Sequence, residues 1–262
     1  MRIVLMLLCY MGLAGQTVKA APHLNYRVVR TEAHDPSSFT QGLAVAGNQL
    51  IEGTGLYGRS HLTVRDRFSG KLLHSTSLSP EEFGEGVTIV GERIVQLTWM
   101  NALGYVYDRH LRRIGTFPLT TEGWGLAYDG KRLVLSDGSA KLWFIDPIKF
   151  VVIGSVDVMD GEQRIDRLNE LEAVDGLIFA NVWQSDRIAI IDPQSGQIRA
   201  WLDLAALRKQ VAFITGGLGP DSVLNGIALL PERGHLLVTG KLWPIMFEIA
   251  VDLRSFHPTG LH

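Results

Sequence analysis

Residues 83 to 108 read FGEGVTIVGERIVQLTWMNALGYVYD, and this stretch holds the pattern that decides the fold. Short runs of β-branched and aromatic residues alternate with Gly, Asn and Asp, which are signals of strands separated by turns. A lone carboxylate, Glu85, stands between two glycines at the start of the first run. The stretch therefore predicts a group of antiparallel strands with a charged residue at its mouth.

The same unit occurs five times along the chain. When the copies are aligned, one residue of each falls at an equivalent position, and the steps between these residues are 44, 39, 46 and 55. Periods of about 40 to 45 residues are typical of propeller blades, whereas a β-sandwich does not call for self-similar units of this length. The sequence predicts an all-β fold, a five-bladed β-propeller. The equivalent residues are Gln41, Glu85, Trp124, Glu170 and Asn225.

The last step is longer than the others because it contains an insertion. Residues Leu202 to Ile214 have helical spacing, and the Gly-rich segment TGGLGP follows at residues 215 to 220. We therefore expect a short helical insertion between the fourth and fifth repeats.

The N-terminal segment resembles a secretory signal peptide. Arg2 precedes an apolar stretch, and a small-residue pattern then ends at Ala20. The apolar stretch is shorter than the roughly 20 residues that span a bilayer, and no other segment approaches that length. We expect residues 1–20 to be a cleaved signal peptide and residues 21–262 to be a single propeller domain. The mature protein is expected to have no membrane span and to be exported, either periplasmic or secreted.

Composition excludes several classes of function. The sole cysteine, Cys9, lies in the expected signal peptide, so thiol nucleophiles, disulfides and cysteine-ligated zinc are excluded from the mature chain. Loss of Arg2 and Lys19 changes 25 basic and 27 acidic residues to 23 and 27, a net charge of −4. Such a chain has no electrostatic footprint for nucleic acid. The histidines are scattered, with no two at a ligand spacing such as i, i+4.

The repeat also predicts where unusual side chains meet. In a propeller, the loop that leads into the innermost strand and the loop that joins the second and third strands emerge on one face. Aromatic and polar residues of these loops are expected to form an aromatic cup at one end of the channel, as in a small-molecule or peptide-end site. These residues are Phe39, Gln41, Phe83, Glu85, Trp124, Asn169, Glu170 and Asn225 from the first loops, and Trp99, Asp137, Trp183, Lys241 and Trp243 from the second.

Each residue type also has a structural interpretation, because tryptophans commonly pack between blades, asparagines cap turns and lysines lie solvated in loops. Glu170 and Glu172 form a separate case. We expect them to point to opposite sides of their strand, so that at most one faces the cup. The other is expected to pair with an arginine such as Arg164 or Arg167.

Eight motifs in one order resemble the glutaminyl-peptide cyclotransferase family of plants and bacteria, from about Phe39 to Ile249. The resemblance implies a five-bladed propeller enzyme that converts N-terminal glutaminyl residues of peptides or proteins to pyroglutamate and releases ammonia. It also implies a zinc-independent enzyme, unlike the animal enzymes of this activity, which use zinc on an unrelated fold. The motifs are FTQGL (39–43), GTGLYGRS (53–60), FGEGVT (83–88), GWGLAYDG (123–130), RLNELE (167–172), ANVWQSD (180–186), LNGIA (224–228) and VTGKLWP (238–244).

The resemblance further implies which residues form the site. We expect Glu85 to move the protons of the reaction, and Lys241, Gln41, Asn169 or an indole N–H to stabilise the oxyanion. The expected partners are peptides or proteins with N-terminal Gln, and a monomer is expected. No metal or cofactor is expected for catalysis, while a structural cation in the channel stays open. The substrate-binding residues implied are Phe39, Phe83, Trp99, Trp124 and Trp183.

Two other functions stay open at this point. One is a metal-dependent lactonase or ester hydrolase, in which oxygen ligands surround a cation. The other is a non-enzymatic propeller that binds peptide ends and releases them unchanged. The ligands of the first alternative are Glu85, Asn169, Asn225 and Asp137.

Overall fold

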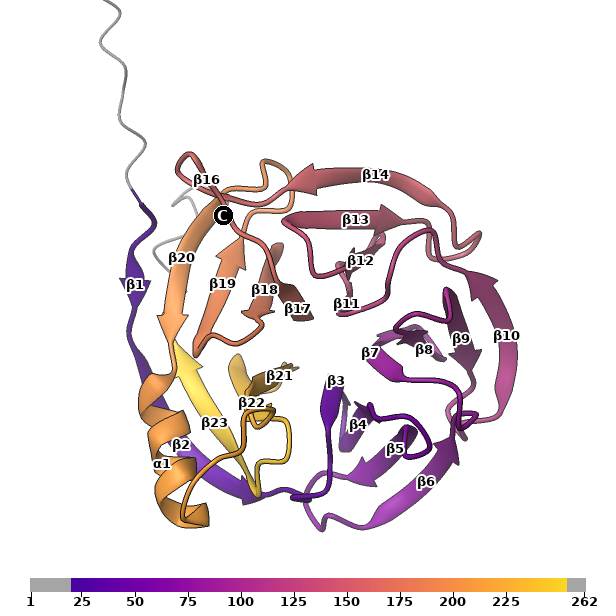
Figure 1. The fold of residues 1–262 in the computed structure, drawn as a ribbon, viewed down its shortest axis with the longest axis horizontal. Coiled ribbons are helices and arrows are strands. Elements are labelled where there is room, and N and C mark those ends of the chain that lie inside the picture. Colours follow the sequence, from indigo (N-terminus) through magenta and orange to yellow (C-terminus); the bar gives the residue numbers. More distant parts are fainter. Residues whose placement is uncertain (1–19, 254–262) are drawn as a thin grey trace, which may run out of the picture.

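The structure, a computed structural model, describes residues 20–253, so the expected signal peptide lies outside the described residues except for its last member, Ala20. Five antiparallel sheets are arranged around a central axis as the blades of a propeller, as Figure 1 shows. The predicted fold class is confirmed. Within residues 20–253, no helix has the length and apolar character needed to cross a bilayer.

The blades follow one another along the chain, and each runs from an innermost to an outermost strand. The first contains β3 (Thr40–Ala46), β4 (Gln49–Thr54), β5 (His61–Asp66) and β6 (Leu72–Ser77). The second contains β7 (Gly84–Val90), β8 (Arg93–Thr98), β9 (Leu103–Tyr107) and β10 (Arg113–Pro118). The third contains β11 (Leu126–Tyr128), β12 (Leu133–Ser136), β13 (Lys141–Ile145) and β14 (Val152–Asp157).

The fourth blade contains β17 (Leu168–Val174), β18 (Leu177–Val182), β19 (Arg187–Ile191) and β20 (Ile198–Asp203), with the short β1 (His23–Leu24) added in parallel at its outer edge. A small hairpin, β15 (Met159–Asp160) and β16 (Gln163–Arg164), precedes it. The fifth blade contains β21 (Leu224–Leu230), β22 (His235–Gly240) and β23 (Ile245–Val251), and its outermost strand is β2 (Tyr26–Ala33) from the other end of the chain. The pairing of β2 with β23 closes the ring.

Apolar residues on the faces of each sheet pack against the next blade. Ile51 and Leu62 of the first blade, for example, lie in one buried cluster with Val87 and Ile94 of the second. Side chains alternate between the two faces of a strand, so each blade supplies apolar residues to both neighbours. The core is therefore a series of layers between blades.

Glycines allow the innermost strands to approach one another closely at the axis. A Cβ on Gly42 would lie 2.3 Å from the backbone nitrogen of Val87, and one on Gly125 would lie 1.9 Å from the carbonyl oxygen of Asn169. The glycines of FTQGL and GWGL are thus required by packing between blades.

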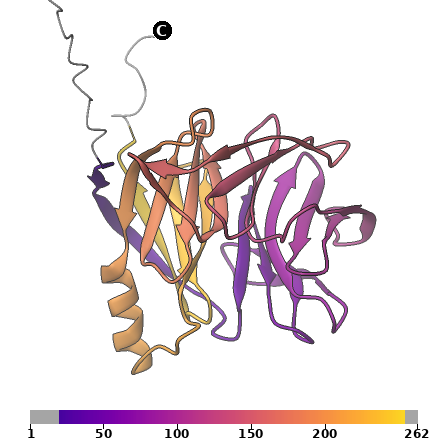
Figure 2. The same ribbon diagram turned by 45° about the horizontal axis from the view of Figure 1, so that its top comes forward.

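The helical insertion is present, but its start differs from the prediction. The helix α1 (Ala205–Thr215) begins three residues later than Leu202, because Leu202 and Asp203 complete β20. Leu207 and Val211 bury its apolar side against the fourth and fifth blades. Figure 2 shows that α1 extends beyond the ends of the strands at the edge of the propeller. The insertion ends in the loop that leads back to β21.

Candidate active site

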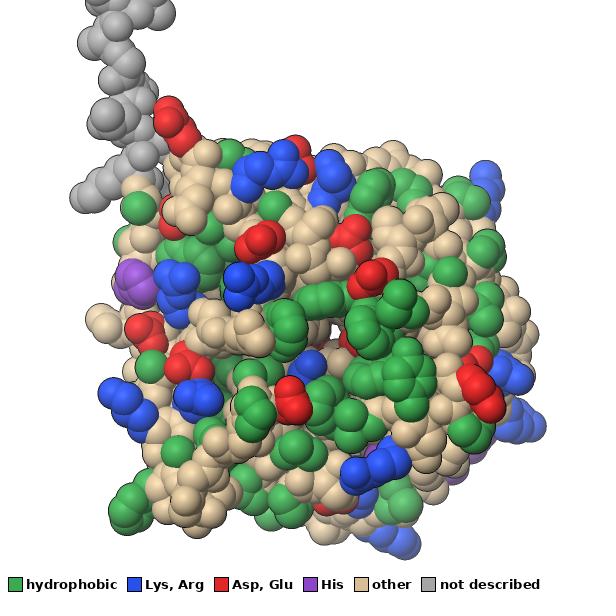
Figure 3. All heavy atoms as spheres, in the orientation of Figure 1, with side chains coloured by type: hydrophobic (Ala, Val, Ile, Leu, Met, Phe, Trp, Pro, Cys, Tyr) green, Lys and Arg blue, Asp and Glu red, His purple; other side chains and the backbone are tan. Residues whose placement is uncertain are grey.

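A cavity of about 300 Å³ opens at one end of the propeller axis. In Figure 3, hydrophobic side chains surround a hollow at this axis. All nine residues that the resemblance implied line the cavity, together with Asp221, and we call this set of ten the cup. The ten are Phe39, Gln41, Phe83, Glu85, Trp99, Trp124, Asn169, Trp183, Asp221 and Lys241.

Equivalent places in the blades supply the polar and aromatic side chains of the cup. Gln41 and Glu85 are the second residues of β3 and β7, and Trp183 and Lys241 directly follow β18 and β22. The repeat therefore directs these side chains to one end of the channel.

Glu85 lies at the bottom of the cup and is only 5% exposed. Its Oε1 accepts a hydrogen bond from Nε2 of Gln41 at 3.0 Å, and Oε1 of Gln41 accepts one from Nδ2 of Asn225 at 3.2 Å. Nδ2 of Asn225 also donates to the carbonyl oxygen of Thr40 at 2.9 Å. This chain of amides fixes which end of the Gln41 amide meets Glu85.

Burial and charge control the ionisation of the two titratable groups that face each other across the cup. Burial raises the pKa of Glu85 well above its usual range; the charge of Lys241 opposes this, and that of Glu122 adds to it. Burial lowers the pKa of Lys241 to about 8, although Glu85 and Asp221 act in the opposite direction. Burial therefore disfavours the charged form of both groups.

The aromatic wall consists of edge-to-face contacts. The ring centroid of Phe83 lies 6.1 Å from that of Phe39 and 5.6 Å from that of Trp99, and Trp124 lies 5.7 Å from Trp183. Nζ of Lys241 lies 4.7 Å from the centroid of Phe39. The wall is apolar and rigid, while a cation occupies one side of it.

Asn169 lines the cavity, but its amide oxygen is buried. Its Oδ1 is buried and has no hydrogen-bond partner among the described residues, while its backbone carbonyl accepts a hydrogen bond from Oγ of Ser136 at 2.7 Å. A buried acceptor without a partner is costly unless a ligand or water satisfies it. The backbone of Asn169 is therefore held beside the cavity, while its buried amide oxygen has an unused acceptor site.

Four residues that were expected in the cup do not line it. Asp137 accepts hydrogen bonds from Oγ of Ser139 and Nε1 of Trp143, because its short side chain meets nearer donors in its own turn. Trp243 is fully buried and donates to the carbonyl of Ser222, because an apolar ring is more stable in the core between blades four and five. Asn225 lies behind Gln41, and Glu170 is directed between blades.

The expectation for Glu170 and Glu172 is wrong. Two residues apart in a strand share one face, so both carboxylates point to the same side of β17, where they accept backbone N–H groups of β21. Glu170 accepts from Ile227 at 2.8 Å and Leu43 at 3.3 Å, and Glu172 accepts from Leu229 at 2.8 Å.

The two arginines named as partners for these glutamates bind elsewhere. Arg164 pairs with Asp157, and Arg167 donates to Oε1 of Gln184. Peptide N–H groups of the next blade, at fixed positions close to β17, satisfy these two carboxylates in place of a cationic side chain.

Two residues of the site were missed from the sequence. Asp221 lines the cup from the loop that follows the insertion, where the repeat offers no equivalent position. Glu122 lies just before GWGL and accepts hydrogen bonds from the indoles of Trp99 and Trp124. The only signal for Glu122 was a carboxylate two residues before a cup tryptophan.

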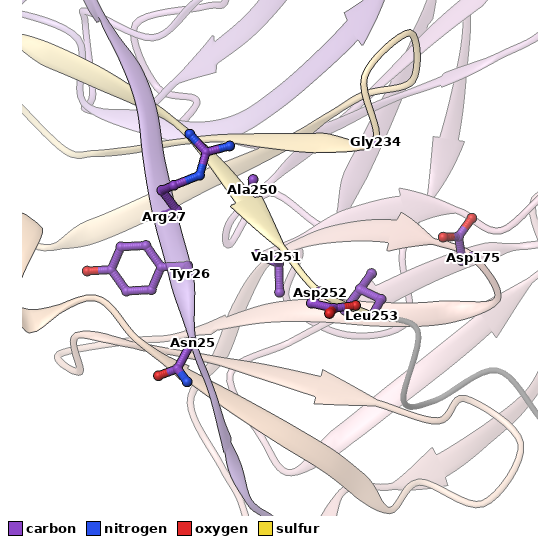
Figure 4. Close-up of a pocket in the computed structure, with 9 residues that line it drawn as sticks. All are labelled: Asn25, Tyr26, Arg27, Asp175, Gly234, Ala250, Val251, Asp252 and Leu253. Atoms are coloured by element: carbon purple, nitrogen blue, oxygen red, sulfur yellow. The ribbon is translucent and has the colours of Figure 1, made fainter.

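A second, wider cavity of about 670 Å³ lies between β2 and the end of β23, far from the cup residues in the sequence. Figure 4 shows that Arg27 and Tyr26 of β2, and Asn25 just before it, project in different directions. None of the ten cup residues lines this cavity, which borders on Leu253, the last residue described. The chemistry is therefore assigned to the cup.

Within residues 20–253, no three His, Cys, Asp or Glu side chains are grouped so that they could hold a metal ion. The oxygen ligands suggested for a hydrolase are also not assembled, since Asp137 and Asn225 are engaged elsewhere.

Known proteins match both the sequence and the fold. A family model described as glutamine cyclotransferase matches residues 2–251. A glutaminyl-peptide cyclotransferase of Arabidopsis thaliana is 40% identical over 249 residues, which cover 92% of this chain and 77% of that protein. The crystal structure of Myxococcus xanthus glutaminyl cyclase matches with a TM-score of 0.82 at 35% identity, over 88% of this chain and 98% of that one. The WD40 β-propeller domain of Doa1, with a TM-score of 0.50 at 11% identity over 80% of this chain and 63% of that one, shares the fold alone.

Proposed function

This chain belongs to the glutamine cyclotransferase family and is a glutaminyl cyclase, and from this premise we propose that Glu85 carries the proton transfers of the reaction in the cup. The proposed substrates are peptides or proteins with N-terminal Gln. The observation that carries the proposal is the buried carboxylate of Glu85, held by Gln41 and exposed to the cavity.

The reaction is an intramolecular acyl transfer, so its main demand is orientation. The α-amine of the glutaminyl residue must reach the γ-amide carbonyl of the same residue, and a tight aromatic cavity favours that folded conformation. A cavity of about 300 Å³ takes the first residue and leaves the remaining peptide outside. We therefore expect weak preference for residues beyond the first.

One carboxylate is enough for both proton transfers. As the amine nitrogen forms a bond with the amide carbon, Glu85 takes one of its protons. The protonated Glu85 then gives that proton to the amide nitrogen, the carbon–nitrogen bond breaks and ammonia leaves. The raised pKa of Glu85 makes its carboxylate a stronger base than a carboxylate in water, which favours removal of a proton from the amine.

The oxyanion of the intermediate needs fixed donors, and Lys241 is the strongest of the expected candidates because it carries a charge. The indole N–H groups of Trp99 and Trp124 do not fit this role, since both donate to Glu122. Gln41 already directs its amide toward Glu85. Lys241 is thus the proposed oxyanion group, with Asn169 as a second polar contact to the substrate.

Replacement of Glu85 by Gln tests the proposal. The substitution keeps size and removes the base, so kcat/KM for a Gln-initiated dipeptide should fall by about 10² to 10⁴. Ammonia release and loss of the free amine measure turnover, and circular dichroism checks the fold. The exposed Glu92→Gln, in the same blade, serves as the control and should retain full activity. A folded Glu85→Gln protein with normal turnover would rule out the proposed role.

The same assay addresses the alternative functions. A cation-dependent hydrolase would lose activity in EDTA and act on lactones or esters, and a binding module would return the dipeptide unchanged. We further propose that the protein is an exported monomer. Edman sequencing of the mature chain, with Ala21 expected first, and its elution volume in gel filtration test these two points.

A further inference from the structure

Glu122 contacts two cup tryptophans with one oxygen atom. It lies in the loop between β10 and β11, and its Oε2 accepts hydrogen bonds from Nε1 of Trp99 at 2.7 Å and Nε1 of Trp124 at 3.0 Å. Trp99 belongs to the second blade and Trp124 leads into the third. A single carboxylate therefore connects two blades at the mouth of the cup.

Glu122 also joins the two parts of the aromatic wall. One part runs from Phe39 through Phe83 to Trp99, and the other pairs Trp124 with Trp183. The hydrogen bonds of Glu122 reach the last ring of the first part and the first ring of the second. The wall is continuous through this carboxylate.

Neither tryptophan is fully buried, so packing alone does not hold these rings. A hydrogen bond from Nε1 decides which edge of an indole faces the rim and which part faces the cavity. Hydrogen bonds to a charged acceptor are roughly twice as strong as neutral ones. The orientation of both rings thus depends on Glu122.

The charge of Glu122 is also placed where the substrate enters. The side chain is exposed, and both indole bonds use Oε2, which leaves Oε1 for another donor. A peptide N-terminus, with a pKa of roughly 7.7 to 8.0, arrives mostly as an ammonium group at neutral pH. The charged groups of the cup itself are Glu85, Asp221 and the cation Lys241.

We propose that Glu122 is a positioning residue for the cyclisation: it sets the orientation of the Trp99 and Trp124 rings, and its charge favours entry of the N-terminal ammonium group. The proposal rests on the cyclase function of the cup. It does not depend on Glu85 as the proton carrier, because ring orientation and substrate entry precede the chemical step.

Two substitutions separate the two effects of Glu122. In Glu122→Gln, the amide oxygen still accepts both indole N–H groups and only the charge is lost. We expect KM to rise severalfold with little change in acrylamide quenching of tryptophan fluorescence. The acid side of the kcat/KM profile should move to lower pH, because the charge of Glu122 contributes to the raised pKa of Glu85.

Glu122→Ala removes the hydrogen bonds as well as the charge. We expect kcat/KM to fall by about 10-fold to 100-fold, the effect of losing charge-assisted hydrogen bonds, and acrylamide quenching to increase. The exposed Glu162→Ala, in the turn between β15 and β16, is the matched control and should behave as the native protein.

The inference is overturned if Glu122→Ala matches Glu162→Ala in both kinetics and quenching. It is also overturned if Glu122→Gln loses as much kcat/KM as Glu122→Ala, because the hydrogen bonds then have no role. Retained activity in Glu85→Gln would refute the proton-transfer mechanism alone, since the quenching and KM effects of Glu122 do not require it.

Discussion

Glu85 and Lys241 are a carboxylate and an ammonium group whose pKa values both shift in the cup, upward for Glu85 and downward for Lys241. Burial is the largest cause for each, and it acts in opposite directions because it disfavours the charged form of either group. Burial therefore makes the carboxylate of Glu85 more ready to take up a proton. It also makes Lys241 lose its positive charge at a lower pH than a lysine in water.

Lys241 gives a prediction at the scale of the residue. Its pKa of about 8 means that the ammonium form is lost above that pH, so kcat/KM should decline on the alkaline side if this charge stabilises the oxyanion. In Lys241→Met, kcat should fall by about 10² to 10³, and the alkaline decline should disappear. The pH dependence of ammonia release measures both effects.

Substitution of the exposed Lys149 by Met provides the control and should leave the profile unchanged. An unchanged kcat in folded Lys241→Met would remove this residue from the mechanism and leave the oxyanion to other donors.

At the scale of the element, the loop that carries Lys241 is anchored through a buried ion pair. His34, at the end of β2, directs Nε2 to Oε1 of Glu52 at 2.9 Å and Nδ1 to the carbonyl of Trp243 at 2.6 Å. Both ring nitrogens face acceptors, so the geometry calls for the imidazolium form. The backbone N–H of Leu242 also donates to Ser38 at 2.7 Å. The N-terminal segment thereby holds the turn after β22.

The ionisation of this pair follows from its contacts. Burial alone lowers the pKa of His34, but the charge and hydrogen bond of Glu52, the Trp243 carbonyl and the charge of Asp35 raise it above its usual value. Burial alone raises the pKa of Glu52, and His34 with two hydroxyl donors brings it below its usual value. The pair therefore stabilises the fold fully between the ordinary pKa values of about 4.5 for Glu52 and about 6.5 for His34.

Replacement of His34 by Gln tests this element. At about pH 6 the free energy of unfolding should fall by about 3 to 5 kcal/mol, because Glu52 is left as a buried charge without its cation. The loss should shrink as the pH rises through the raised pKa of His34, since the native protein then loses the same contribution. Urea denaturation at several pH values measures the difference between the two proteins.

The exposed His23→Gln is the control for the loss of a histidine and should not alter stability. A difference that stays constant over the whole pH range would show that His34 is neutral in the native protein.

Strand β17 contributes one side chain to the cup and the next side chain to the contacts between blades. Asn169 lines the cup, while the next residue, Glu170, binds backbone N–H groups of β3 and β21 and so links three blades. Adjacent side chains of a strand point to opposite faces, which separates the two roles.

At the scale of the whole molecule, the N-terminal segment fastens two places on the propeller. Strand β2 closes the fifth blade, where Arg30 reaches the buried Glu248 at 2.6 Å, and β1 lies along the outside of the fourth blade. Before β1, the backbone nitrogen of Ala21 donates to Oδ1 of Asp160 at 2.7 Å. Asp160 also accepts the indole N–H of Trp201 at 2.9 Å.

If the chain is cleaved after Ala20, we predict that the interaction between Ala21 and Asp160 becomes stronger. The Ala21 amide would become an ammonium group beside the Asp160 carboxylate, a charged pair that is partly buried. In a chain that begins at Ala21, Asp160→Asn should lower the free energy of unfolding by about 1 kcal/mol. In a chain that retains residues before Ala21, the same change should matter less, because no charge is lost from the pair.

Thermal denaturation of four proteins measures this difference in stability. The four are the native and the Asp160→Asn sequence, each in a chain that begins at Ala21 and in a chain that retains the residues before it. An equal effect of Asp160→Asn in both backgrounds would contradict the pairing of the new N-terminus with this carboxylate.

Much of the fold and the site was predictable, and the reasons are local. The alternation of side chains and the Gly, Asn and Asp turns recur with each blade, so the repeat located Gln41, Glu85, Trp99, Trp183 and Lys241 on one face. The helix start was predicted too early, because LDL has the composition of either a helix start or a strand end, and pairing with β19 made it a strand. Asp221 was missed because it lies in the loop that follows the insertion, where the repeat offers no equivalent position.

The sequence by itself determined the number of blades and the face on which the cup lies, since these follow from the periods and turn residues of near neighbours. Only the tertiary structure decided which partner each polar group takes. Glu170 binds Leu43, Glu122 binds Trp99, and Asn225 binds Gln41, all residues that lie far apart in the sequence. A hydrogen bond forms with whichever donor lies within about 3 Å, and that distance exists only after the blades have packed around the axis.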